Sequence, residues 1–193
     1  MEILEKLTPT ETYLVRDNSG STFKELLKLT LADLCLKKVL KIEDKEVQSH
    51  PRSPVRVLKY VLTGKNFNNY KPKPHELAFL SPFQKNSEIE VLFNHTIKMA
   101  YENVKNRKRY VYKSILLNPE LTERFHKDFF TKLIGGISLN NAGESAKIKV
   151  DQELRKLESE LPQIIQNDKK RALEILNRIG GNVFLISGLD FEL

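Results

Sequence analysis

The sequence predicts an α+β protein in which helices predominate. Apolar residues recur at helical spacing along most of the chain, and several segments begin with the residue pattern of a capped helix. Only residues 39–63 change to the β-branched and aromatic composition of strands. With 193 residues, 40% of them hydrophobic and 30% charged, the chain is long enough to bury a core of its own. We therefore expect helical residues to exceed strand residues several-fold.

The first two helices are predicted from capping boxes. TPTE (8–11) combines a hydroxyl at the N-cap, proline at the first helical position and a glutamate that can reach back, and it predicts a helix over 9–16. TFKE (22–25) is a second box, which opens a strongly apolar helix ending near Leu36. That helix either continues through Thr30 or breaks there into two shorter ones.

A β-hairpin is expected next. Residues 39–47 and 55–63 are rich in β-branched and aromatic side chains and partly alternate in polarity. The intervening QSHPRSP (48–54) contains two prolines, which central strands exclude. These residues predict two antiparallel strands joined by a long polar tip, followed by a stiff connector at 70–74.

The middle of the chain is predicted to return to helices. KPHE (73–76) opens one helix, and SEIE (87–90) is a third capping box with an amphipathic helix behind it. Residues 110–117 are short and apolar, and they fit either a strand or a helix. His75, in a helix first turn, and His50, beside a proline, are expected at the surface.

Three further helices are expected in the C-terminal part. NPE (118–120) has the cap, proline and acid of a helix start, which predicts a helix over 119–134. A loop is expected at 140–145 and a charged helix over 145–160, which Pro162 ends or kinks. The last helix is expected over 168–179.

The predicted core is drawn from the apolar faces of these helices. Its expected members are Leu14, Phe23, Leu26, Leu27, Leu34, Leu92, Phe93, Ile97, Phe125, Phe129 and Leu133. The tail, residues 182–193, is apolar and needs a surface to cover it, either within this fold or on another chain.

The chain contains an internal repeat. An ungapped offset of 65 residues aligns Pro9 with Pro74 and Glu11 with Glu76, together with the second pair of capping boxes. Matching caps with matching apolar faces predict two related helical units, of which only the first is followed by a hairpin.

The first unit resembles a known class of segment. PTETYL (9–14) and FKELLKLTLADLCLKKVLKI (23–42), with a hairpin after them, are similar to winged-helix-like segments of bacterial proteins of uncharacterised function. The resemblance is closer over 9–63 than over 74–117. It implies a winged-helix-like unit at 1–70. The repeat adds a second related helical unit at 71–143, and the C-terminal helices and tail follow at 144–193; we expect all three to pack as one body. The leucine-rich second helix has few side chains that read base edges.

Charge is distributed unevenly along the chain. The net charge is +7, and residues 37–73 alone carry ten basic and three acidic residues. KNRKRYVYK (105–113) adds five cations without an acid, interleaved with two tyrosines. Basic residues with aromatic neighbours suit phosphate neutralisation and base stacking, whereas a solvated surface is the plainer interpretation.

Two classes of function remain open. The first is a non-enzymatic interaction or scaffold module that binds a protein partner or a second copy, which the leucine-rich helix and the apolar tail favour. The second is sequence-independent binding of nucleic acid or another polyanion through residues 39–65 and 105–113, which the charge favours. The candidate contact residues of the second class are Arg52, Arg56, Lys59, Lys65, Lys105, Arg107, Lys108 and Arg109.

Enzyme chemistry has no support in the sequence. No phosphate-binding glycine loop or nucleophile elbow occurs, and the four histidines are scattered. We therefore expect no catalytic residues, no cofactor and no metal site. The single cysteine, Cys35, excludes an internal disulfide and is expected in the core. The absence of a leader-like N-terminus and of a long apolar run predicts a cytoplasmic chain without a membrane span.

Overall fold

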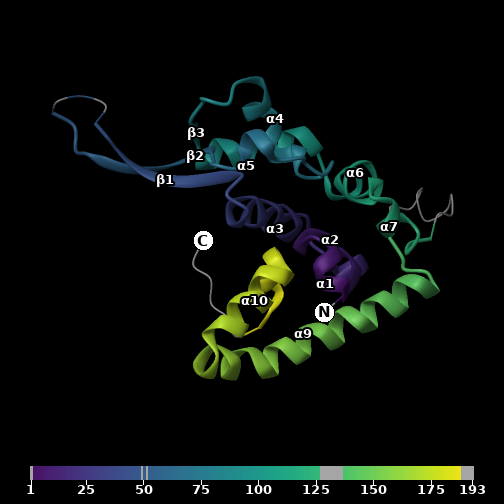
Figure 1. The fold of residues 1–193 in the computed structure, drawn as a ribbon. Helices are drawn as coiled ribbons and strands as arrows, with labels where there is room; N and C mark the ends of the chain where they lie inside the picture. Colours follow the sequence, from purple (N-terminus) through teal and green to yellow (C-terminus); the bar gives the residue numbers. More distant parts are fainter. Residues whose placement is uncertain (1, 49, 51, 127–136, 188–193) are drawn as a thin grey trace.

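The structure, a computed structural model, describes residues 2–48, 50, 52–126 and 137–187. It is predominantly helical with one small antiparallel sheet, so the predicted fold class is confirmed. Helices α2 and α3 lie centrally between the teal layer of α4, α5 and α6 and the green and yellow helices α9 and α10 (Figure 1). No helix among the described residues is both long and apolar enough to cross a membrane.

The N-terminal helices begin where their capping boxes predict. Helix α1 covers Glu2–Lys6, α2 covers Pro9–Asp17 and α3 covers Phe23–Leu36. The Thr8 hydroxyl accepts from the Glu11 amide, and the Glu11 carboxylate accepts from the Thr8 amide at 2.8 Å. A short 3₁₀ turn, Asn18–Gly20, joins α2 to α3.

Helix α3 does not break at Thr30. The Thr30 hydroxyl donates to the Leu26 carbonyl one turn earlier at 2.9 Å, which satisfies the group without interrupting the helix. The same hydroxyl lies 2.8 Å from the hydroxyls of Thr10 and Tyr110. A buried threonine with these partners is compatible with one continuous helix.

The predicted hairpin forms and projects from the body (Figure 1). Strand β1, Leu40–Val47, pairs antiparallel with β2, Arg56–Thr63, along their whole lengths. Two helices followed by a hairpin is the order that the winged-helix resemblance implies, and the winged-helix assignment itself stays a prediction.

A third strand replaces the helix start predicted at SEIE (87–90), and that prediction was wrong. Strand β3, Val91–Leu92, pairs with β2, and α5 begins only at Phe93. The Thr63 hydroxyl donates to the Ser87 carbonyl at 3.0 Å. Pairing with the free edge of β2 therefore makes Val91–Leu92 a strand, although the local capping pattern predicts a helix there.

The middle of the chain is helical, including most of residues 110–117, for which the sequence allowed either a strand or a helix. Helix α4 is Leu77–Lys85, α5 is Phe93–Val104 and α6 is Arg107–Lys113, with a 3₁₀ turn at Phe67–Asn69 before them and one at Ile115–Leu117 after them. Residues 110–117 are thus helical except for Ser114, which lies between α6 and the 3₁₀ turn. Helix α4 continues past the internal Pro82.

The helix predicted over 119–134 is shorter than expected. Helix α7 covers only Pro119–Thr122, and Phe125 then forms an antiparallel bridge with Leu139. The prediction was therefore wrong from Glu123 to His126, and residues 127–136 lie outside the described part of the chain. The bridge is a long-range contact that the local helix signal cannot show.

The C-terminal helices are longer than predicted. Helix α9 is Asn141–Asn167, α10 is Lys169–Ile179, and a 3₁₀ segment covers Gly180–Leu185. The loop expected at 140–145 is wrong, because Asn140 caps α9 by accepting from the Gly143 amide at 3.0 Å. Pro162 does not end α9, since the fully buried Leu161 keeps that part of the helix packed on the core.

One hydrophobic core unites the three predicted units. Buried apolar residues form a single cluster from Ile3 to Ile186. The division into units at 70 and 143, and their packing as one body, stay predictions. Of the predicted core residues, five are buried: Leu14, Leu26, Leu27, Leu34 and Phe125. Four are partly buried, Phe23, Leu92, Phe93 and Ile97, and two lie outside the described residues, Phe129 and Leu133.

The tail is covered within the fold as far as the structure describes it. Val183 and Ile186 are buried. The Asn182 amide donates to the carbonyls of Leu4 and Leu7 at 2.6 and 2.8 Å. The tail, as far as Ser187, is therefore covered by α1 and the segments that pack next to α1.

Candidate functional site

The structure separates the predicted basic residues into two groups. Arg52, Arg56 and Lys59 are exposed on the projecting hairpin, and Lys65 follows its base. Lys105 and the cations of α6 lie beyond α5, on the other side of the view in Figure 1. The two groups therefore do not form one continuous basic surface.

The hairpin is less basic than its cations suggest. The strand register places Asp44 opposite Lys59, and Lys45 forms an ion pair with Glu90 of the neighbouring segment. The acidic residues of β1 therefore neutralise much of the stem. The cations Arg52 and Arg56 remain at its exposed outer end.

Arg107 is engaged inside the protein. Its guanidinium donates to the Ser21 carbonyl at 2.6 Å and to the Asn18 carbonyl at 2.8 Å, which ties α6 to the turn before α3. Tyr110 is fully buried, and its hydroxyl donates to the His75 carbonyl at 3.1 Å. Of the two tyrosines interleaved with the cations, only Tyr112 is available to a ligand-sized cavity.

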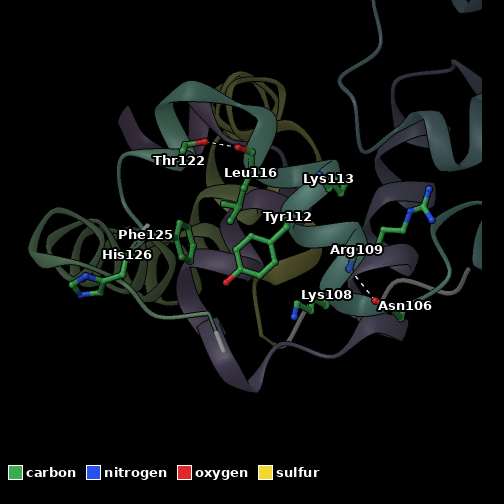
Figure 2. Close-up of a pocket in the computed structure, with 9 residues that line it drawn as sticks. All are labelled: Asn106, Lys108, Arg109, Tyr112, Lys113, Leu116, Thr122, Phe125 and His126. Carbon is green, nitrogen blue, oxygen red and sulfur yellow. Dashed lines mark hydrogen bonds between the residues drawn. The ribbon is translucent and has the colours of Figure 1, made fainter. Parts of the chain in front are cut away.

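That cavity lies beside α6 and is shown in Figure 2. It has a volume of about 740 Å³. The described residues that line it are Asn106, Lys108, Arg109, Tyr112, Lys113, Leu116, Thr122, Phe125 and His126. Two of the predicted contact residues, Lys108 and Arg109, therefore belong to one pocket.

Helix α6 positions the cationic side of the pocket. The Asn106 side chain caps it by accepting from the Arg109 amide at 2.9 Å. Lys108 and Tyr112, and likewise Arg109 and Lys113, are four residues apart, so each pair occupies neighbouring turns of one face. This spacing places cations beside the Tyr112 ring.

The segment after α6 forms the apolar side. The Thr122 hydroxyl donates to the carbonyls of Leu116 and Asn118, which fastens α7 against the preceding 3₁₀ turn. Phe125 is held by its bridge to Leu139 and is almost fully buried. Leu116 and Phe125 thus supply a floor that the sequence did not reveal, because the bridge partner is distant in the chain.

The pocket joins a cationic rim to an apolar floor. Among its described lining residues there is no carboxylate and no cysteine or serine nucleophile. Nor do the described residues contain a group of three histidine, cysteine, aspartate or glutamate side chains that could hold a metal ion. The arrangement can bind a molecule that has both an anionic group and an apolar part.

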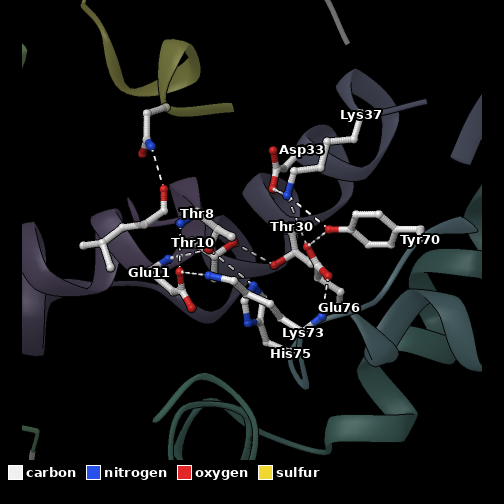
Figure 3. Close-up of polar contacts among 12 residues, drawn as sticks. Thr8, Thr10, Glu11, Thr30, Asp33, Lys37, Tyr70, Lys73, His75 and Glu76 are labelled. Carbon is white, nitrogen blue, oxygen red and sulfur yellow. Dashed lines mark hydrogen bonds and ion pairs between the residues drawn. The ribbon is translucent and has the colours of Figure 1, made fainter. Parts of the chain in front are cut away.

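A second cluster of charged side chains lies in the protein interior (Figure 3). Glu11, His75 and Glu76 are each at most 1% exposed, so the surface position predicted for His75 was wrong. Lys73 donates to Glu11 at 2.7 Å. Lys37 forms ion pairs with Glu76 at 3.4 Å and with Asp33. This buried polar cluster joins α2 and α3 to the connector before α4.

The two copies of the internal repeat meet in the buried polar cluster, where their glutamates make the same contact. Glu76 accepts from the Lys73 amide at 2.7 Å, just as Glu11 accepts from the Thr8 amide at 2.8 Å. In each turn the glutamate accepts from the amide of the residue before the proline. Lys73 of the second turn also forms an ion pair with Glu11 of the first. The 65-residue offset therefore corresponds to two similar turns that meet in the interior.

Burial determines the protonation states in this cluster. Desolvation lowers the pKa of His75 to about 4, so its ring is neutral at pH 7. Burial opposes ionisation of Glu11, yet the neighbouring positive charges and the Thr8 amide hold its pKa below its usual value. Cys35 is partly buried and packs against the core instead of lying within it, and burial raises the pKa of its thiol to about 11. These paired groups stabilise the fold.

Comparisons with protein-family models, with curated proteins and with solved structures found no match to this chain. The functional argument therefore rests on the geometry of the pocket beside α6.

Proposed function

We propose that this chain is a non-enzymatic interaction module whose pocket beside α6 binds an acidic segment of a protein partner. The observation that supports the proposal is the combination of an apolar floor, Leu116 and Phe125, with a rim of three cations. An acidic segment carrying one large apolar residue complements both features. The net charge of +7 adds long-range attraction for such a partner.

A buried anchor residue and a charged rim have different roles in such binding. Burying an apolar side chain against Tyr112, Leu116 and Phe125 removes it from water, which is worth about 1.5–3 kcal/mol for a Leu- or Phe-sized group. Each exposed ion pair at the rim contributes only about 0.2–1 kcal/mol but steers association and selects for acidic partners. The apolar anchor is therefore expected to carry affinity and the cations specificity.

Nucleic-acid binding is the second candidate, and the exposed Arg52 and Arg56 at the outer end of the hairpin favour it. Phosphate contacts there need no base-reading side chains, so such binding would be independent of sequence. It ranks second because β1 acids neutralise the stem and because the α6 cations lie on a different part of the molecule.

Fluorescence anisotropy with defined probes tests the proposal. The probes are a labelled acidic nonapeptide with a central phenylalanine, the same peptide with alanine there, and single-stranded and duplex oligonucleotides. We expect the phenylalanine peptide to bind more tightly than the alanine peptide and the oligonucleotides. Equal binding of both peptides, or tighter binding of an oligonucleotide that depends on the α6 cations, would overturn it.

Two matched double variants locate the binding. Reversal of Arg109 and Lys113 to Glu should weaken peptide binding at least tenfold, which corresponds to about 1.4 kcal/mol. Reversal of the exposed Lys169 and Lys170 on α10 changes the net charge equally and should alter binding less than twofold. Equal losses in both variants would show that only total charge matters, which would contradict a pocket.

A further inference from the structure

The sequence of the tail complements the pocket beside α6. Beyond Ser187 the chain continues as GLDFEL (188–193), in which Phe191 stands between Asp190 and Glu192. Of the ten phenylalanines in the chain, Phe191 alone has an acidic residue on both sides. The chain therefore contains in its own sequence an acidic segment with a large apolar residue at its centre.

The pocket offers a partner for each part of this segment. Its floor is apolar, and its cations Arg109 and Lys113 are exposed at the rim. An extended segment presents alternate side chains on opposite faces. Phe191 can therefore enter the pocket while the two acids beside it stay at the rim, within reach of the cations.

Ser187 determines where this segment leaves the body. Its amide donates to the Glu158 carboxylate of α9 at 2.9 Å. Val183 and Ile186, which precede it, are buried in the core. The starting point of the segment is therefore fixed beside Glu158.

The pocket lies near the start of α9, far from Ser187 (Figure 1). Phe125 of the pocket bridges to Leu139, just before α9 begins. Glu158 lies seventeen residues beyond the first residue of α9, which is about 26 Å at 1.5 Å per residue. The four residues from Ser187 to Phe191 span at most about 14 Å. Phe191 therefore does not reach the pocket of its own chain.

An apolar groove between α3 and α10, the α10 groove, is the alternative surface on the same chain. It has a volume of about 510 Å³, and Leu36 and Leu173 on its walls are exposed. Among its described lining residues the only cation is Lys37, which already pairs with Asp33 and Glu76. This groove offers apolar contact without a counter-charge for the two acids of the tail, so the pocket beside α6 is the better match.

We propose that the pocket beside α6 receives residues 188–193 of a second copy of this chain, with Phe191 as the anchor. This inference rests on the proposed function and names the partner of the same site. Each copy carries one pocket and one tail, so two copies can exchange tails about a twofold axis and close a dimer. The second contact then forms within the assembly, which strengthens two individually weak contacts.

Sedimentation velocity of the full chain over a concentration series tests the association. The parent should associate as its concentration rises. Phe191→Ala should weaken association by at least about tenfold, because the anchor no longer buries an aromatic ring. Phe191→Leu, the matched control, keeps an apolar anchor and should stay within about threefold of the parent. A parent that remains monomeric up to its solubility limit, or equal losses in the two variants, would overturn the proposal.

A labelled peptide of residues 187–193 tests the contact directly by fluorescence anisotropy. The receptor is the full-length Phe191→Ala chain, whose own tail competes least for the pocket. The parent peptide should bind it. A peptide with Asp190→Lys and Glu192→Lys should bind at least about tenfold more weakly, because its charges then repel the rim. Equal binding of the two peptides would contradict the contact.

A charge exchange locates the contact. Arg109→Glu and Lys113→Glu, introduced into the receptor, should restore binding of the reversed peptide. Lys169→Glu and Lys170→Glu on α10 change the net charge equally and are the matched control, which should not restore it. No restoration by the pocket variant, or equal restoration by the control, would place the segment elsewhere and overturn the proposal.

The same measurements separate this inference from the proposed function. If the acidic nonapeptide binds as expected above and the tail peptide does not, the self-association alone is refuted. If neither peptide binds, both proposals fail. Tail-peptide binding that Leu173→Ala weakens, and that the reversal of Arg109 and Lys113 leaves unchanged, would assign the segment to the α10 groove and contradict the second-copy contact.

Discussion

The buried polar cluster and the pocket beside α6 both concentrate charge, with opposite consequences. In the cluster, Lys73 and Lys37 are paired with glutamates that are at most 1% exposed. In the pocket, Lys108, Arg109 and Lys113 surround an apolar floor with no carboxylate among the described lining residues. Charges that are paired and buried stabilise a fold, whereas exposed cations beside an apolar floor, such as Arg109 and Lys113, leave a surface for an anionic partner. The same residue types thus serve structure in one place and recognition in the other.

Glu11→Gln should give the largest change, because it breaks a buried ion pair. Removing one partner of such a pair costs about 3–5 kcal/mol, and the lower end, about 3 kcal/mol, applies because Lys73 is one-third exposed. Urea unfolding should show this loss with peptide binding unchanged at a temperature where both proteins are folded. Glu120→Gln, at an exposed position, should change stability by less than about 0.5 kcal/mol. Equal effects of the two substitutions would show that the cluster is not a structural centre.

His75 should make stability depend on pH. Its pKa falls from 6.5 to about 4 on folding, so between these values the unfolded chain binds a proton that the folded protein does not. Stability is therefore complete above about pH 6.5 and falls by about 2–3 kcal/mol as the pH drops to 4. Glu11, whose pKa is lowered, adds a further loss as the pH falls through its folded value.

Urea unfolding at a series of pH values measures this dependence. The substitution His75→Gln should remove the part of the slope between pH 6.5 and 4.5. His50→Gln, at an exposed hairpin position, should preserve it. A slope that survives in His75→Gln would assign the pH dependence to other groups.

Charge reversal of Arg109 and Lys113 should weaken peptide binding and leave stability unchanged, the opposite of Glu11→Gln. Both side chains are exposed and make no ion pair with another described residue, so the double variant should unfold within about 0.5 kcal/mol of the parent. Calorimetry would measure this together with the binding loss expected above. A large loss of stability would mean that the rim, like the cluster, is a structural feature.

The hairpin reversal Arg52→Glu, Arg56→Glu and Lys59→Glu should have the smallest effect on the folded protein. It should change stability by less than about 1 kcal/mol, most of it from the lost pairing of Lys59 with Asp44. Acidic-peptide binding should persist.

Nucleic-acid binding provides the second readout of the hairpin variant. If the hairpin binds nucleic acid, contact with about three to five phosphates gives a log-affinity slope of about −3 to −5 against log salt. Gel shifts at two salt concentrations should then show binding by the parent and none by the triple variant. Undiminished binding by the folded variant would leave the hairpin as a solubilising arm.

The pocket was only partly foreseeable. The cations of α6 and Tyr112 stand out in the sequence, because charge and aromatic content are local properties. Leu116 and Phe125 do not stand out, because they become a floor only when Phe125 bridges to Leu139.

The helix starts at Thr8, Thr22, Asn106 and Asp168 are determined by the sequence itself. A side-chain oxygen that accepts from an amide three residues later is a local interaction, and it forms wherever the neighbouring residues permit a helix. The change to strand composition at 39–63 is local in the same sense, and the hairpin forms there.

Only the tertiary structure decided the positions that depend on distant partners. SEIE (87–90) has a helix signal, yet the open edge of β2 converts the residues behind it into a strand. His75 has a surface signal, yet it is 1% exposed, with its carbonyl accepting from the Tyr110 hydroxyl and its ring 3.4 Å from the Thr8 hydroxyl. The physical reason is the same in both cases: a local signal of about 1 kcal/mol yields to the burial and hydrogen bonding supplied by segments far away in the chain.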